Sequence, residues 1–253
     1  MNSIKFILSN PVAEDDGKVL ISRVDLCKLI DPVLRPSYIT TSAPFDTVVL
    51  DAGHGGHDSG ARGVYGFEKD YTLAMVLAVR DALLKRGIKV KTTRDTDVFI
   101  PLHGRVDVAN ATPNSILVSL HFNSGGSTAT GIETFALSPQ GSSSTFMGER
   151  GWDTSAFSGN RQDSENIALA TAVHAMVINK FKVVDRGIKR ARFTVLTGCL
   201  RPGILFEGGF VTNAEECRLI AAPSYRQLLA NTIADGILNY RKALQPRVGS
   251  TTR

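Results

Sequence analysis

Three side chains that could ligate a metal ion stand at the ends of expected strands or at the start of an expected helix. His54 follows a buried strand, Glu68 begins the first long helix, and His121 ends a second buried strand. Two imidazoles and one carboxylate leave the fourth position on zinc open, which is the usual ligand set of a catalytic rather than a structural zinc site. We therefore predict that these residues hold one zinc ion at a hydrolytic site.

Amide hydrolysis at such a site also requires a group that takes a proton from water and returns one to the leaving amine. Glu207 lies in an apolar strand, between Phe206 and two glycines, where an unpaired carboxylate is costly to bury. We predict that Glu207 is this acid and base. His57, three residues after His54, is a further candidate at the site, as a residue that contributes to substrate binding.

Each of these residues taken alone has a simpler structural explanation. A histidine after a strand is often only a hydrogen-bonded residue, and Glu68 could be a carboxylate favoured by the dipole at a helix N-terminus. His103 and His174 are interpreted as surface or structural residues. The residue types alone leave the substrate open among peptides, acylated sugars and other amides.

The elements that must position these side chains alternate between strands and helices from Thr47 onward. This order predicts an α/β fold, as a single three-layer domain with a central, mostly parallel, twisted sheet flanked by helices. The carboxyl ends of neighbouring parallel strands would bring His54 and His121 together. The expected strands are 47–53, 88–94, 115–122, 131–137, 192–196 and 203–209, and the expected helices are 69–86, 105–111, 164–181 and 224–244.

Changes in pattern divide the chain into three parts. Residues 1–44 are interpreted as an N-terminal extension or linker, or a fragment of another module, and residues 45–244 as the catalytic domain. Residues 245–253 form a C-terminal tail. Within the domain, the Ser- and Gly-rich stretch 138–163 is long for a connection and is interpreted as a mobile loop that contacts substrate.

Composition excludes several classes of protein. The 253 residues are 43% hydrophobic and 21% charged, and no apolar run reaches the length of a membrane span, so stable membrane insertion is not expected. The net charge of +5 favours polyanions, but scattered Lys and Arg residues argue against nucleic acid and suit an anionic cell wall. The three cysteines lack ligand spacing, so neither a disulfide framework nor a cysteine zinc site is predicted.

Several segments, taken in order, resemble the motifs of a known family. They are DAGHGGHDSGARGVYGFEKDYTL, VKTTRDTD with GRVDVAN, SLHFNS, GIETFAL, and RFTVLTGCLRPGILFEGGFVTNAEE. They are similar to the successive motifs of the zinc-dependent N-acetylmuramoyl-L-alanine amidases, the type-3 family with an AmiC-like catalytic domain. The similarity runs from about Phe45 to Tyr240.

The resemblance implies roles for individual residues. The first histidine of GHGG, the glutamate before the long helix and the histidine of SLHFN are zinc ligands in the family, and here they are His54, Glu68 and His121. The glutamate of the strand motif EGGFVTN is the catalytic acid and base, here Glu207. Asn123 follows His121 in its motif and is expected to help shape the site.

The resemblance also implies the substrate and the setting. The substrate would be the amide between N-acetylmuramic acid and L-alanine in peptidoglycan, cut during wall remodelling, daughter-cell separation or lysis. This implies a periplasmic or extracellular enzyme, although the first residues show no convincing export signal. Some relatives carry a helix that blocks the site until an activator displaces it, and the stretch 138–163 has little amphipathic pattern for such a helix.

Two other readings of the same residues stay open. One is a zinc peptidase of related fold that acts on free cell-wall peptides. The other is a noncatalytic wall-binding module, whose signature would be the loss of a ligand or of the acid and base. We expect a monomer, with an activator protein as a possible partner.

Overall fold

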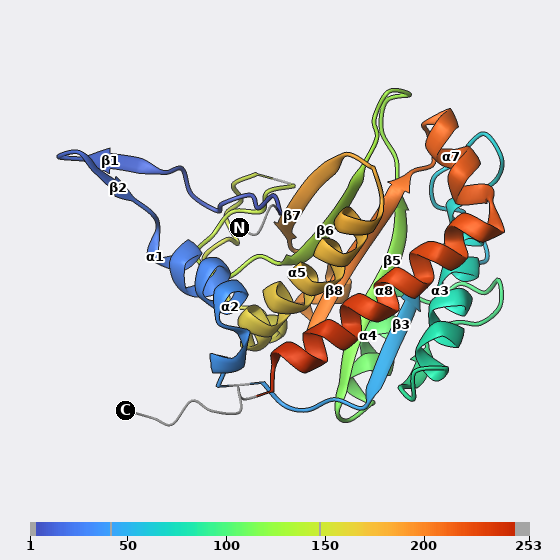
Figure 1. Cartoon of the computed structure of the whole chain (residues 1–253), viewed down its shortest axis with the longest axis horizontal. Helices are drawn as coiled ribbons and strands as arrows, with labels where there is room; N and C mark the ends of the chain where they lie inside the picture. The colour runs from blue at the N-terminus through green and yellow to red at the C-terminus, as the bar shows by residue number, and fades with distance from the viewer. Residues whose placement is uncertain (1–3, 41, 147, 246–253) are drawn as a thin grey trace.

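A six-stranded sheet forms the middle of the computed structural model, which describes residues 4–40, 42–146 and 148–245 (Figure 1). Its strands lie in the order β4 (Lys89–Thr92), β3 (Thr47–Ala52), β5 (Ser115–Asn123), β8 (Gly203–Phe210), β6 (Ile132–Leu137) and β7 (Asp185–Ala191). Neighbouring strands pair in parallel, except that β6 and β8 are antiparallel. The mostly parallel sheet confirms the predicted fold class.

Helices cover both faces of this sheet, and the strand sequences show why. Strands buried on both faces read as continuous apolar runs, and alternate residues of β3 enter different cores. Val48 and Leu50 belong to the core beneath three long helices, whereas Val49 belongs to a core on the opposite face, which is covered by shorter ones. The long helices are α3 (Glu68–Leu84), α5 (Asp163–Lys180) and α8 (Pro223–Ala243), and the shorter ones include α4 (Leu102–Asn110) and α6 (Thr194–Thr197).

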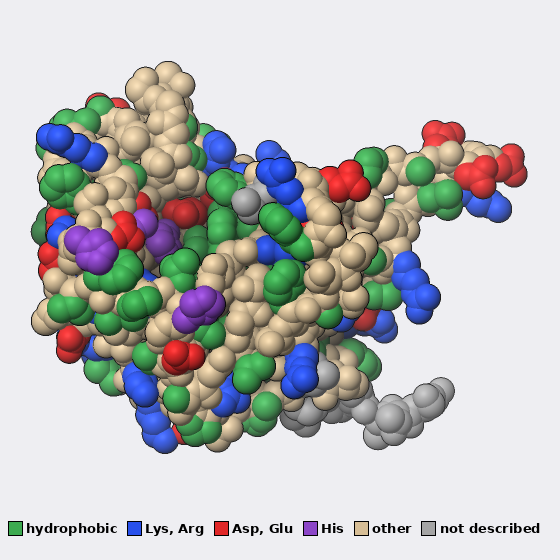
Figure 2. All heavy atoms as spheres, turned by 180° about the vertical axis from the view of Figure 1, so that it is seen from behind, with side chains coloured by type: hydrophobic (Ala, Val, Ile, Leu, Met, Phe, Trp, Pro, Cys, Tyr) green, Lys and Arg blue, Asp and Glu red, His purple; other side chains and the backbone are tan. Residues whose placement is uncertain are grey.

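The face under the short helices is only partly covered. Helices α4 and α6 pack over the amino-terminal half of the central strands and leave the carboxyl-terminal half open. Figure 2 shows this face hollowed, with histidine and acidic side chains at one side of the hollow and hydrophobic side chains beside them. Open α/β sheets bind their ligands at this edge.

The prediction of a strand at 192–196 is wrong. The strand in this region is β7, just before it, and residues Thr194–Thr197 form the single turn of α6. The sequence of β7 does not have the apolar pattern of a buried strand, because it contains Arg190. The side chain of Arg190 is nevertheless buried and paired with Asp25. The short helix α7 (Ala214–Ala221) was not expected, whereas most other elements end within about three residues of their predicted bounds.

The N-terminal segment packs against the edge of the sheet beside β7. The Ile7 N–H donates to the Ile188 carbonyl and the Ile188 N–H donates to the Lys5 carbonyl, so residues 5–7 run alongside that strand. The hairpin of β1 (Ala13–Asp15) and β2 (Lys18–Leu20) then projects away from the body (Figure 1). Four short helical segments follow: α1 (Arg23–Asp25), η1 (Leu26–Ile30), α2 (Asp31–Leu34) and η2 (Pro36–Tyr38).

Two further expectations concern the ends of the chain and the cysteines. Of the expected tail 245–253, only Gln245 lies within the described residues. Cys27, Cys199 and Cys217 are free thiols, with Cys27 exposed and the other two buried. Among the helices of the described chain, none is both long enough and apolar enough to cross a bilayer.

Candidate active site

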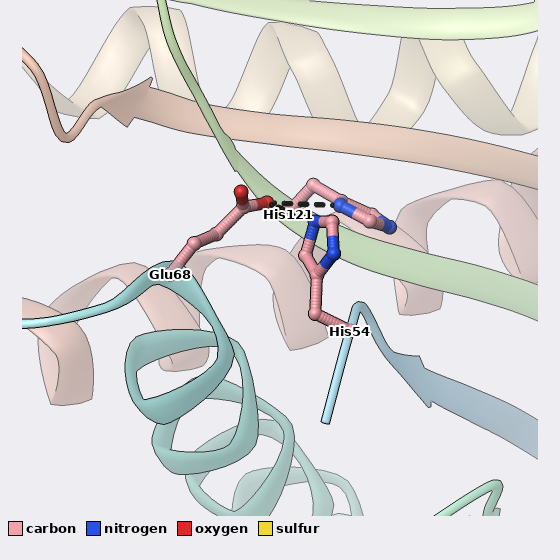
Figure 3. A group of neighbouring side chains, drawn as sticks. All are labelled: His54, Glu68 and His121. Atoms are coloured by element: carbon pink, nitrogen blue, oxygen red, sulfur yellow. Dashed lines mark hydrogen bonds and ion pairs between the residues drawn. The ribbon is translucent and has the colours of Figure 1, made fainter. Parts of the chain in front are cut away.

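The three candidate metal ligands meet at the carboxyl end of β3 and β5. Glu68 Oε1 lies 3.1 Å from His54 Nε2 and 3.0 Å from His121 Nδ1 (Figure 3). The ligand atoms of all three lie within 4.8 Å of one another. The distances of 3.1 and 3.0 Å from Glu68 Oε1 to the two imidazole nitrogens are close to those between neighbouring ligands of one ion with bonds of about 2 Å. Residues far apart in the chain thus form one group that could hold a metal ion.

His54 is aimed at this group by its backbone and by a neighbouring carboxylate. It has a positive φ of 60° in the loop after β3, a conformation that is uncommon outside glycine and is found at functional sites. Asp58 Oδ2 lies 2.9 Å from His54 Nδ1, which leaves Nε2 facing Glu68. A carboxylate that fixes a ligating imidazole in this way is a common partner of metal sites. Asp58 was not among the predicted site residues, although an aspartate four residues after a candidate ligand is a visible signal in the sequence.

Glu68 is the first residue of α3, and its carboxylate is held on both sides. Oε2 accepts a hydrogen bond from the Ala61 N–H at 2.9 Å, while Oε1 faces the two imidazoles. Burial opposes ionisation of Glu68, but hydrogen bonds to His121 and His54 outweigh it and hold the pKa of the carboxyl far below its ordinary value. Burial lowers the pKa of His54, but the hydrogen bonds and charges of Glu68 and Asp58 raise it by more. The pKa of His54 therefore lies above its ordinary value.

Glu207 stands beside this group on the next strand. In the sheet register it lies opposite His121 of β5 on one side and Glu133 of β6 on the other. Its Oε2 atom is buried and makes no hydrogen bond within the described residues. Burial raises the pKa of Glu207 well above its ordinary value, and the charges of Glu68 and Glu133 add to the effect. This carboxyl can therefore hold a proton at a pH where an ordinary glutamate is ionised.

Glu133 shares the face of Glu207 but has a different environment. Its carboxylate pairs with Arg186 at 2.9 Å and Lys189 at 2.5 Å, and it accepts a hydrogen bond from the Asn123 amide at 2.7 Å. Glu133 thereby fixes the orientation of Asn123, which lines the cavity described below. Asn123 was among the predicted site residues, whereas Glu133 was not.

Two arginines hold the end of β3 where the site begins. Arg105 donates to the backbone carbonyl of His54 at 2.7 Å and forms a buried ion pair with Asp51 at 2.8 Å. Arg94 donates to the Gly53 carbonyl at 2.8 Å. Both guanidinium groups therefore hold backbone carbonyls at the end of β3, which is a structural role.

The remaining histidines lie elsewhere. His57 is exposed, with its ring 4.2 Å from that of Phe99, and lies outside the set of described residues that line the cavity. His103 is exposed at the start of α4. His174 is fully buried and hydrogen-bonded to Thr134 and Asp185, which is a structural role.

A cavity of about 800 Å³ extends from the histidines across Glu207. Its far side is apolar and includes Leu102, Val195 and Leu205 together with the rings of Phe146 and Phe193. Phe146 belongs to the expected excursion 138–163, whose last residues form the 3₁₀ helix η3 (Ser158–Gln162) and the start of α5. A group that could hold a metal, a protonatable carboxyl and an apolar surface therefore share one cavity.

Gly53 gives the first test of this geometry. A Cβ atom at this position would lie 2.2 Å from His121 Cε1, so the Gly53→Ala variant must push the imidazole out of place. We expect Gly53→Ala to weaken binding of a divalent metal ion about 10- to 100-fold, as does loss of other groups that orient metal ligands. The measurement is a competition titration with a chromophoric chelator.

Gly126→Ala is the matched control, because a Cβ atom there would have no heavy atom within 4 Å. Its metal affinity should equal that of the wild type. Wild-type affinity in Gly53→Ala would show that the position of the His121 ring does not matter for the metal.

Comparison with known sequences identifies relatives of this chain. The family profile described as N-acetylmuramoyl-L-alanine amidase matches residues 48–239, a span that contains the three candidate metal ligands and Glu207. The N-acetylmuramoyl-L-alanine amidase AmiA of Escherichia coli (strain K12) is 34% identical over 219 residues, covering 76% of this chain and 75% of AmiA.

Solved structures of related proteins share the fold. The catalytic domain of CwlV, an N-acetylmuramoyl-L-alanine amidase from Bacillus (Paenibacillus) polymyxa var. colistinus, has a TM-score of 0.65 at 32% identity, covering 79% of this chain and 99% of that domain. The CwlD amidase from Clostridioides difficile, in complex with the GerS lipoprotein, has a TM-score of 0.63 at 25% identity, covering 77% and 98%.

Proposed function

The chain belongs to the N-acetylmuramoyl-L-alanine amidase family, and we propose that it cuts the amide between N-acetylmuramic acid and L-alanine with one zinc ion held by His54, Glu68 and His121. One observation carries the proposal: these three side chains lie together beside Glu207, which pairs in register with His121 on the neighbouring strand. The products would be a stem peptide with a free alanine amine and a glycan strand with a free lactyl carboxylate.

The donor set supports zinc at this position. Two imidazoles and one carboxylate match catalytic zinc sites and leave room for water or substrate. When bound, zinc supplies Lewis-acid polarisation of the scissile carbonyl and activation of water. Asp58 would keep His54 Nε2 turned toward the ion, as a hydrogen-bonded carboxylate does at many metal sites.

We assign the proton transfers to Glu207. Its ionised carboxylate accepts a proton from the water as the oxygen bonds to the carbonyl carbon. Its protonated form then donates that proton to the amide nitrogen as the C–N bond breaks. The raised pKa of Glu207 supports the second step, because a carboxyl with an ordinary pKa is a poor proton donor near neutral pH.

Asn123 and His57 have secondary places in the proposal. Asn123 lines the cavity with its amide held by Glu133, so it is positioned to contact substrate. His57 lies outside the cavity wall but at its rim beside Phe99, where an extended glycan strand could reach it.

The setting follows from the substrate. Peptidoglycan lies outside the cytoplasmic membrane, so we place the activity in the periplasm or the cell wall and the catalytic domain in residues 45–244. The complex of CwlD with the GerS lipoprotein supports including a partner protein in the proposal. Roles in remodelling, cell separation or lysis are part of the same proposal.

Mass spectrometry of digested peptidoglycan tests the proposed reaction. We expect the protein to release stem peptides that begin with a free L-alanine, a chelator to stop the release, and added zinc to restore it. Magnesium is the control ion, since it prefers oxygen ligands and should not restore activity. Cleavage inside stem peptides offered without sugar would instead favour a zinc peptidase, and binding without any cleavage would favour a noncatalytic module.

A further inference from the structure

Two phenylalanine rings stand beyond Glu207 on the side of the cavity away from the metal ligands. We call Phe146 and Phe193 the aromatic wall. Phe146 lies in the loop after β6 and Phe193 directly after β7, whereas the histidines lie at the ends of β3 and β5. Glu207 of β8 lies between these two groups in the order of strands. Both rings line the cavity.

The aromatic wall is a packed structure with one open side. The Phe146 and Phe193 ring centroids are 5.5 Å apart, and both rings meet the buried ring of Phe135, at 5.8 Å and 5.1 Å. Even so, Phe146 is 58% exposed. Its packed side faces Phe135 and Phe193, which leaves other atoms of the ring available to a ligand in the cavity.

Hydrogen bonds hold the loop that carries Phe146. The Thr145 N–H donates to the Arg190 carbonyl and the Arg190 N–H donates to Thr145 Oγ1, each at 2.9 Å. Arg192 pairs with Asp153 at 2.6 Å and donates to the Ser142 carbonyl at 2.6 Å. The loop is thus anchored just before Phe146 and again at Asp153, which places the residue beside β7.

The charges of the cavity indicate what the aromatic wall can bind. Among the described residues that line the cavity, the only Arg or Lys side chains are Arg105 and Arg192, and each is paired with a carboxylate of the protein, Asp51 and Asp153. Neither is left to neutralise the carboxylates of a stem peptide. An apolar aromatic surface without a free cation suits the uncharged C–H face of a sugar ring better than an anionic peptide.

We propose that the aromatic wall is a glycan subsite, which contacts a pyranose ring of the glycan strand while the stem peptide lies on the side of the metal ligands. The inference rests on the proposed function, since it concerns the same substrate. It assigns Phe146 and Phe193 to binding and specificity, and leaves proton transfer to Glu207.

Calorimetric titration with the two products tests the subsite. Stem-free glycan strands and free stem peptide are titrated separately into zinc-loaded protein, and neither contains the scissile amide. We expect Phe146→Ala to weaken glycan binding about 5- to 10-fold and to leave peptide binding unchanged. Phe146→Leu, which keeps apolar packing without a ring, should weaken it to a similar extent. The KM for peptidoglycan should rise in both variants, while kcat should stay within about twofold of the wild-type value.

Trp152→Ala is the matched control. Trp152 lies in the same loop and is 51% exposed, but it is outside the set of described residues that line the cavity. Its loss should change neither titration.

Three results would overturn the proposed glycan subsite. The first is no glycan binding by the wild type, and the second is unchanged glycan binding in Phe146→Ala and Phe146→Leu. The third is that these variants bind the stem peptide more weakly but the glycan as tightly as the wild type does. Failure of the proposed function would appear differently, as wild-type protein that releases no stem peptide, because the titrations require no turnover.

Discussion

Replacing Glu207 with glutamine should lower kcat for peptidoglycan hydrolysis by about 10²- to 10⁴-fold, the usual contribution of general acid and base catalysis. The amide has nearly the same shape as the carboxyl but cannot accept and return a proton. Zinc content, measured by atomic emission, should stay at one ion per chain because Glu207 is not among the three proposed ligands. The melting temperature should not fall, because the variant removes a buried carboxylate with an unpartnered oxygen.

Glu133→Gln is the matched control for Glu207. Glu133 lies in register on the adjacent strand, but its carboxylate is held by Arg186, Lys189 and Asn123. We expect this variant to lower the melting temperature, since two cations lose their partner, and to reduce kcat by less than about tenfold. Full activity in Glu207→Gln would show that another group transfers the proton.

Replacing Arg105 with methionine should lower the unfolding free energy by about 3–5 kcal/mol. The substitution leaves Asp51 buried without its charged partner, although Thr93 and Ser119 still donate to it. It also frees the carbonyl of His54, so the metal affinity should fall as well. Urea denaturation monitored by circular dichroism, with chelator in every sample, separates the loss of stability from the loss of metal.

The stability effect of Arg105→Met should depend on pH in one direction. Burial opposes ionisation of Asp51, but the charge of Arg105 and hydrogen bonds from Ser119 and Thr93 outweigh it and lower the pKa below its ordinary value. A lowered pKa stabilises the fold above the unfolded pKa of about 3.9, and this contribution is lost as the pH falls through the folded value. The difference between variant and wild type should therefore shrink below about pH 4.

Arg218→Met is the control for Arg105, because its pair with Glu215 is largely exposed. It should change the unfolding free energy by less than about 0.5 kcal/mol. The double variant Asp51→Leu with Arg105→Met should recover much of the loss, since both buried charges are then absent. An equally large loss in the double variant would show that packing, and not the ion pair, is responsible.

The sequence predicts the parts of this fold that depend on local pattern. β3, β5 and β8 read as apolar runs because both faces of the central strands are buried. The three candidate ligands and Glu207 could be named because each lies at a strand end, at a helix start or as an isolated charge in an apolar run. Their convergence then follows from the topology of a parallel sheet.

The parts that could not be predicted depend on partners distant in the chain. β7 contains Arg190, and nothing nearby in the sequence indicates that Asp25 pairs with it inside the protein. The role of Glu133 likewise requires Arg186 and Lys189 from another strand. The loop carrying Phe146 lacks periodicity, and its position is set by hydrogen bonds to Arg190 within β7 and to Arg192 just after it.

The place of β8 in the chain and in the sheet determines the order in which the site is completed during synthesis on the ribosome. His54, Glu68 and His121 all belong to the first half of the chain, but Glu207 belongs to its last fifth and enters the sheet between β5 and β6. At about 5–20 residues per second, translation delivers Glu207 on the order of 4–17 s after His121. The nascent chain thus carries every proposed zinc ligand before it carries the group that would make the zinc site reactive.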